Sequence, residues 1–93
     1  MELSDFVGQP CKSRLAYEFI PKRNTTFKLE RVAAALRENG VIVETETPFL
    51  LMLRLAGKNC TLFRTGKIIV KETKGMDKAR EVAEMLVKEL NKA

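Results

Sequence analysis

Residues 61–90 read TLFRTGKIIVKETKGMDKAREVAEMLVKEL, and this stretch decides the fold. Two apolar runs, at 60–64 and 67–72, flank the turn Thr65-Gly66 and predict a pair of antiparallel strands. A helix is predicted after the polar segment 73–77. Its apolar residues fall on one stripe, formed by Ala79, Val82, Ala83, Leu86 and Leu90. A helix of this kind packs on the sheet to which the two strands belong.

The residues further upstream predict another strand and a second helix. Residues 13–20 alternate apolar and polar side chains, a period of two that indicates a strand ended by Pro21. Residues 27–38 have apolar side chains at helical spacing, with an N-cap expected among the polar residues 24–26. Gly40 is expected at the left-handed position that follows the helix.

Two further strands are predicted at 41–47 and 49–55, and the second of them is apolar on both faces. One of its faces carries Phe49, Leu51, Leu53 and Leu55. The other carries Leu50, Met52 and Arg54. A hairpin turn at 56–59 leads into the strand at 60–64. A strand of this type is buried on both sides, or it has one side available to a partner.

The order of these elements predicts an α+β fold: a five-stranded antiparallel curved sheet with two helices on one face (β-α-β-β-β-β-α). Residues 13–93 are expected to form this single domain, and residues 1–12 are expected to be an N-terminal arm. Two helices cover only one face of such a sheet. The opposite face is therefore expected to be open.

The composition favours a binding protein over an enzyme. The chain of 93 residues has 17 basic and 12 acidic side chains, a net charge of +5 that favours contact with polyanions. It has no histidine, the usual general base, and no pair of carboxylates at a persuasive spacing. We therefore expect no enzymatic activity, no cofactor, no metal and no small-molecule substrate. The lack of histidine and tryptophan, with Lys and Glu making up much of the surface, is compatible with a heat-adapted source.

The two cysteines, Cys11 and Cys60, do not form the CxxC pair that would indicate a zinc site. They are expected to be reduced and partly buried, or to form a disulfide if the fold brings their Cα atoms within about 7 Å. No apolar run is long enough to span a membrane, and residues 1–10 lack the apolar region of a signal peptide. A cytoplasmic location is therefore expected, without membrane contact.

Two strand sequences and the helix after them carry a likeness to a known family. Leu62-Phe63, the turn 64–67 and Ile68-Ile69-Val70 form one run, and Met52-Leu53-Arg54-Leu55 forms another. They resemble one half-repeat of the TATA-box-binding protein family, in which a strand ending in Ile-Phe precedes a Ser-Gly-Lys turn, an apolar strand and a long helix, and in which another strand reads Ile-Met-Arg-Ile. The resemblance covers about residues 13–91. The family protein has two such halves in a saddle, whereas this chain has room for one.

The resemblance implies a homodimer whose concave sheet face binds double-stranded DNA in the minor groove, because a single half forms a saddle only by pairing two copies. It implies that Phe63 lies at the position of an intercalating phenylalanine and that Ile69 contacts bases. Lys67 and Arg54 lie where the family contacts phosphates.

Two departures from the family's pattern bear on this implied site. Pro48, rather than Phe49, falls at the position of the family's second wedge, unless a bulge shifts the register. Three acids, Glu18, Glu44 and Glu46, lie on strands that border the open face, where they would oppose a phosphate backbone.

Two functional hypotheses follow. In the first, a homodimeric DNA-binding module grips the backbone through Arg54, Arg64, Lys67 and Lys71, with Phe63, Leu50, Met52 and Ile69 against the groove. In the second, a protein-interaction or self-association module buries Leu50, Met52 and Phe63 in an interface and has no nucleic-acid role. Charge and family likeness favour the first. The directions in which Glu18, Glu44 and Phe63 point discriminate between them.

Overall fold

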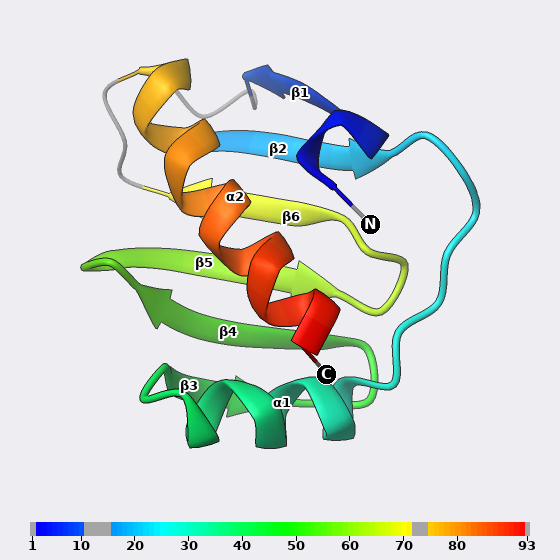
Figure 1. Ribbon diagram of the computed structural model, residues 1–93, viewed down its shortest axis with the longest axis vertical. Coiled ribbons are helices and arrows are strands. Elements are labelled where there is room, and N and C mark those ends of the chain that lie inside the picture. Colours follow the sequence, from blue (N-terminus) through cyan, green and yellow to red (C-terminus); the bar gives the residue numbers. More distant parts are fainter. Residues whose placement is uncertain (1, 11–15, 72–74, 93) are drawn as a thin grey trace.

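The computed structural model describes residues 2–10, 16–71 and 75–92. Its elements in chain order are a 3-10 helix η1 (Leu3–Asp5), β1 (Phe6–Pro10), β2 (Ala16–Pro21), α1 (Leu29–Glu38), β3 (Ile42–Glu46), β4 (Leu50–Leu55), β5 (Lys58–Phe63), β6 (Ile68–Lys71) and α2 (Met76–Lys92). The predicted α+β class is confirmed (Figure 1).

The sheet has six strands in the order β1-β2-β6-β5-β4-β3, and every neighbouring pair is antiparallel. The prediction of five strands was therefore wrong. The sixth strand comes from the segment expected to be an N-terminal arm, because Phe6 pairs with Pro21 and Pro10 pairs with Tyr17. Gly8 and Pro10 are unusual in strands, and for that reason the sequence did not predict a strand here.

Gly8 has a packing role in this edge strand. A Cβ atom built on it would lie 2.7 Å from Cε1 of Phe19, which is too close for any larger residue. The phenylalanine ring therefore lies against the backbone of β1, and the core extends to the outermost strand.

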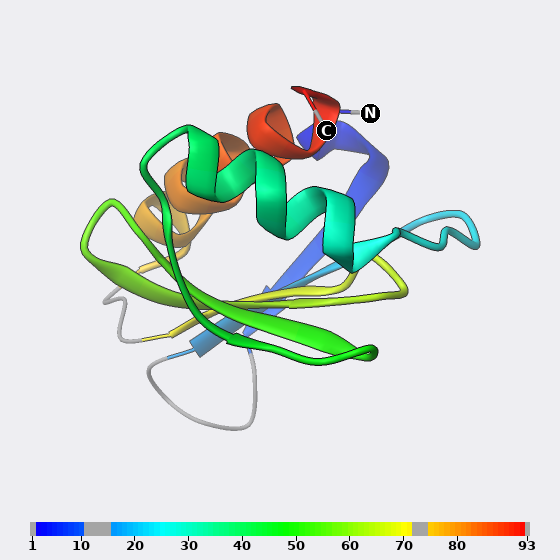
Figure 2. The same ribbon diagram turned by 90° about the horizontal axis from the view of Figure 1, so that it is seen from below.

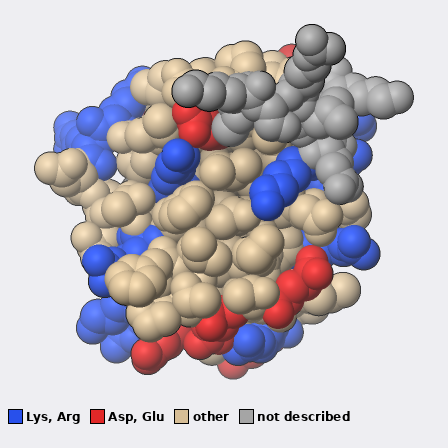
Figure 3. All heavy atoms as spheres, turned by 180° about the vertical axis from the view of Figure 1, so that it is seen from behind, with Lys and Arg blue, Asp and Glu red and all other residues tan. Residues whose placement is uncertain are grey.

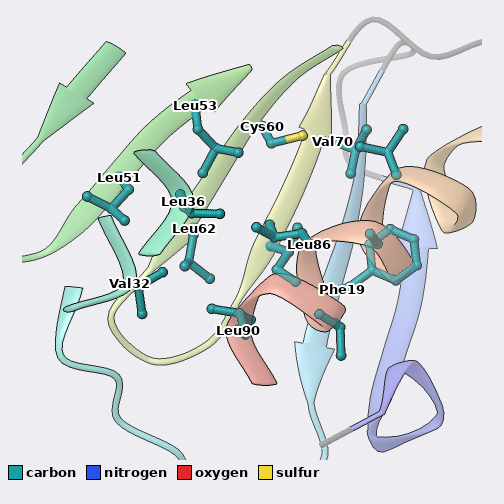
Figure 4. Close-up of a cluster of buried hydrophobic side chains, with 14 of the residues drawn as sticks. Phe19, Val32, Leu36, Leu51, Leu53, Cys60, Leu62, Val70, Leu86 and Leu90 are labelled. Atoms are coloured by element: carbon teal, nitrogen blue, oxygen red, sulfur yellow. The ribbon is translucent and has the colours of Figure 1, made fainter. Parts of the chain in front are cut away.

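Both helices pack on the same face of the sheet, as predicted (Figure 2). The core between them holds Phe19, Leu51, Leu53, Cys60, Leu62 and Val70 from the strands, and Val32, Leu36, Leu86 and Leu90 from the helices (Figure 4). The predicted apolar stripe of α2 is buried throughout. Among the described residues, no helix is long and apolar enough to cross a membrane.

The turn between β4 and β5 is tighter than predicted. Ala56 and Gly57 alone connect the two strands, with φ angles of +52° and +75°, as two-residue hairpins require. The start of α1 was also predicted wrongly, because its N-cap is Lys28, which makes no side-chain capping bond. The expected left-handed Gly40 is confirmed, with φ +80°.

Gly66, in the turn between β5 and β6, lies against the segment that leads into α1. Its φ is +92°, and an added Cβ would lie 2.8 Å from Cγ of Pro21 and 3.0 Å from Cε2 of Phe27. Nearby, the N–H of Phe27 donates a hydrogen bond of 2.8 Å to the carbonyl oxygen of Arg64. This bond keeps the chain extended past the predicted N-cap residues. Because Pro21 and Phe27 approach the backbone of Gly66 closely, position 66 requires glycine.

We expect Gly66→Ala to lower the free energy of unfolding by about 2–5 kcal/mol, because left-handed strain of about 1–2 kcal/mol adds to overpacking of about 1–3 kcal/mol. Gly57→Ala is the matched control, since its φ is also positive but nothing lies within 4 Å of the added Cβ. The loss of free energy of unfolding in Gly57→Ala should therefore contain only the left-handed strain of about 1–2 kcal/mol. Urea unfolding monitored by circular dichroism measures both variants, and equal losses would contradict the tight packing around Gly66.

Candidate interaction face

Three rows of side chains cross the face of the sheet that neither helix covers, which we call the open face. The strand registers bring the members of each row side by side. The first row contains Val7, Ile20, Lys67, Phe63 and Leu50. The second row contains Gln9, Glu18, Ile69, Thr61, Met52 and Thr45. The third row contains Ala16, Lys71, Asn59, Arg54 and Ile42.

The open face carries apolar side chains on all six strands. Four of its large apolar side chains are exposed, namely Ile42 (59%), Val7 (49%), Met52 (39%) and Ile20 (37%). Leu50, Phe63 and Ile69 are half-buried in the same surface. In Figure 3 uncharged atoms fill the middle of this side, and acids gather along its lower margin. Apolar side chains gathered on a face that no helix covers are the usual feature of a binding surface.

The charges nearest the centre of the open face are paired within the chain. Nζ of Lys67 lies 3.1 Å from a carboxylate oxygen of Glu18, and the side-chain amide of Gln9 donates a hydrogen bond to the same carboxylate. The Lys67 ammonium also lies 5.5 Å from the centroid of the Phe63 ring. Lys67 and Glu18 therefore neutralise each other, and the cation occupies a face of the aromatic ring.

Most of the predicted site residues lie together. Five of the predicted nucleic-acid contacts are on the open face, namely Arg54, Phe63, Lys67, Ile69 and Lys71, and so are the predicted interface residues Leu50 and Met52. Arg54 and Lys71 form no ion pair with any described residue. Arg64 lies apart from this group, because it follows the end of β5 and its guanidinium lies 5.6 Å from the centroid of the Phe49 ring.

Phe49 is 65% exposed, so the prediction that it joins Leu51 and Leu53 on the buried side of β4 was wrong. The cause is a tight turn at Thr47. Its Oγ1 accepts hydrogen bonds from the N–H groups of Phe49 and Leu50, at 3.2 and 3.0 Å, and its own N–H donates to the carbonyl of Leu50 at 2.9 Å. The bulge near this turn is in β3, between Val43 and Thr45, and leaves the register of β4 unchanged.

The open face also carries a hollow of about 300 Å³ between β3 and β6. Thr61, Met52 and Asn59 line it, with Glu44 and Lys71 on its margins. A larger hollow of about 630 Å³ lies at the start of α1, away from this face, and Arg64 lines it. Phe63 and Glu18 lie on the open face, and Glu44 borders it. The side chains expected to discriminate between a DNA partner and a protein partner therefore give a surface that is both apolar and acidic.

Residues with reactive or metal-binding side chains are sparse in the described part of the chain. No group of three or more His, Cys, Asp or Glu residues there could hold a metal ion. Cys60 is a free thiol on the helix side of β5, 2% exposed, and burial raises its pKa to about 12. Cys11 lies outside the described residues, so the predicted relation between the two cysteines stays a prediction.

The open-face residues that the sequence reasoning missed include the apolar Val7, Ile20 and Ile42 and the polar Gln9. Val7 and Gln9 belong to the unpredicted strand β1, and their alternation with Phe6 and Gly8 is the signal that was available. Ile20 and Ile42 lie at strand ends, where the direction of a side chain depends on the register of the partner strand.

A scan against protein-family models and searches of curated proteins and of solved structures gave no match for this chain. The likeness to a half-repeat of the TATA-box-binding protein therefore stays a resemblance in sequence pattern.

Cys60 should resist alkylation in the folded chain, because its thiol stays protonated and covered up to a pH of about 12. In a Cys11→Ser background we expect iodoacetamide at pH 9 to label the urea-unfolded protein and to leave the native protein unmodified over the same time, as read by mass spectrometry. Rapid labelling of the native protein would contradict the burial.

The same shift in the pKa of Cys60 makes stability depend on pH. The unfolded thiol ionises near its ordinary value of 9.0, so the free energy of unfolding should fall as pH rises from 9.0 toward 12. The Cys60→Ala variant should lack this part of the decline.

Proposed function

We propose that this chain is a non-enzymatic protein-interaction module that binds another protein chain through the open face of its sheet. The observation that carries the proposal is the exposure of Ile20, Ile42 and Met52 on the face that the two helices leave uncovered. Burying such side chains removes apolar surface from water, which is the main driving force of protein association. A partner that covers this face therefore gains from burying apolar side chains on β2, β3 and β4.

The internal pairing of charges favours a protein partner over a polyanion. A phosphate backbone binds through cations that release counterions, and at the centre of the open face Lys67 is engaged by Glu18 and by the Phe63 ring. Binding a phosphate there would first require separating Lys67 from Glu18. An apolar or neutral protein surface leaves that pair intact.

The edges of the sheet disfavour a saddle built from two copies. Such a saddle joins two sheets edge to edge, and the edges here are β1 and β3. β1 ends in Pro10, which has no N–H to donate, and β3 carries a bulge and the exposed acid Glu44, while Glu46 pairs with Arg37 of α1 at 3.0 Å. Proline, bulges and charges are the usual means by which edge strands avoid pairing.

Binding of double-stranded DNA by a homodimer is the second candidate, and one observation favours it. Arg54 and Lys71 lie in the same row of the open face, without a described acid paired to either, on a chain with a net charge of +5. Two cations beside an apolar surface with a phenylalanine resemble the arrangement that the family likeness implies. The two candidates differ in the kind of partner and in sensitivity to salt.

A photo-crosslinking residue placed on the open face should capture protein. We expect benzoylphenylalanine at position 42, in place of the exposed Ile42, to give protein adducts on irradiation in cells that express the chain. The matched control replaces Met85, which is 43% exposed on α2. Adducts from both positions, or from neither, would refute the proposed function, and adducts that nuclease removes would favour the second candidate.

A duplex titration at two salt concentrations tests the DNA candidate directly. We expect no binding by fluorescence anisotropy at 0.15 M salt. Binding that falls steeply with salt and weakens in Arg54→Ala would establish the second candidate in place of the first. Arg80→Ala is the control, because Arg80 is an exposed cation on α2, on the helix side of the sheet.

A further inference from the structure

The open face has the dimensions and the charge pattern of a surface that binds a copy of itself. The two longer extents of the molecule, 30 and 28 Å, enclose a rectangle of about 800 Å², so the open face is of the order of the area that each partner buries in a standard stable interface, about 800 Å². A second copy offers a face of the same size and the same mixture of apolar and charged side chains. A smaller partner would leave exposed apolar side chains uncovered.

We propose that the open face binds the open face of a second copy, about a twofold axis that runs along the strands between β5 and β6. The proposal rests on the proposed function, since it names the partner of the same surface. In aligned packing two sheets keep their strands within about 30° of each other, which puts the axis either along the strands or across them. The charges on the open face decide between these two axes.

An axis along the strands exchanges β5 with β6 and β4 with β2, and it keeps each row opposite the same row. Ile20 then faces Leu50 of the second copy, and Ile69 faces Thr61 of the second copy. Lys67, whose ammonium already lies beside a phenylalanine ring, faces a second such ring at Phe63 of the other copy. Nowhere in the three rows does a charge face a like charge.

An axis across the strands gives a worse match. It keeps each strand opposite itself and reverses the order of the rows. Glu18 in the middle row then faces Glu18 of the second copy, and Lys67 in the first row faces Lys71 of the second copy. Like charges opposed in an apolar interface are destabilising. The arrangement along the strands avoids both contacts.

The first test traps the proposed register with a short thiol reagent. Ile20→Cys and Leu50→Cys are combined in a Cys11→Ser background. Within one chain these positions lie on β2 and β4, three strand spacings or about 14 Å apart. Across two sheets packed about 10 Å apart, the facing thiols are about 5 Å apart. We therefore expect a methylene-bridged bis-thiosulfonate to link two chains and to form no link within a chain.

Leu50→Cys with Arg54→Cys is the matched control, because these positions face each other only if the axis runs across the strands. We expect this variant to stay unlinked. Linked dimers of the control, together with unlinked Ile20/Leu50 chains, would overturn the proposed register.

The second test places a negative or a positive charge at position 52, opposite Glu18 of the second copy. In the proposed register Met52 faces Glu18 of the second copy, so Met52→Glu opposes two carboxylates and Met52→Lys pairs unlike charges. We expect sedimentation equilibrium to show a dimer for the unmodified chain, and a dissociation constant about tenfold weaker for Met52→Glu than for Met52→Lys. Equal weakening of both variants would overturn the register.

The outcomes separate this inference from the proposed function. An unmodified chain that stays monomeric at high concentration, while position 42 still crosslinks to another protein, overturns the self-association and leaves the proposed function standing. A monomer that gives no protein adduct at position 42 overturns both.

Discussion

The structure depends on the packing of two amphipathic helices against one face of a single antiparallel sheet. Leu36 and Leu86 meet the buried faces of β4, β5 and β6, where Leu51, Leu62 and Val70 are fully buried. This packing uses the apolar stripes of both α-helices of the described residues. Because β4 is apolar on both sides, the same strand that completes the core also presents Leu50 and Met52 on the opposite side. The open face is thus a consequence of how the core is closed.

Side chains of the chain itself limit the charge on the open face and protect the two edges of the sheet. Glu18 and Lys67 pair across β2 and β6, which keeps the centre of the open face free of net charge. Pro10 on β1 and the bulge in β3 protect the two edges. These features make the edges poor templates for another strand, so the proposed association uses the face of the sheet. The proposed partner would be recognised by shape and apolar area more than by charge.

Much of the fold was predictable because its signals are local. The stripe of α2, the two-sided pattern of β4 and the left-handed Gly40 all follow from the spacing of neighbouring residues. The errors occurred where a distant contact overrides the local signal. The N-cap prediction failed because Phe27 bonds to Arg64, and β1 was missed because its strand character comes from pairing with β2.

The sequence by itself determined the class of fold, the succession of elements after residue 16 and the presence of one unpartnered apolar face, because these follow from periodicity and from the number of helices. Only the tertiary structure decided which side chains share that face. The side-chain period of a strand is two, so membership depends on registers between strands that lie far apart in the chain. The Glu18–Lys67 pair and the outward position of Phe49 arise from such registers and turns, and they decide the chemistry of the open face.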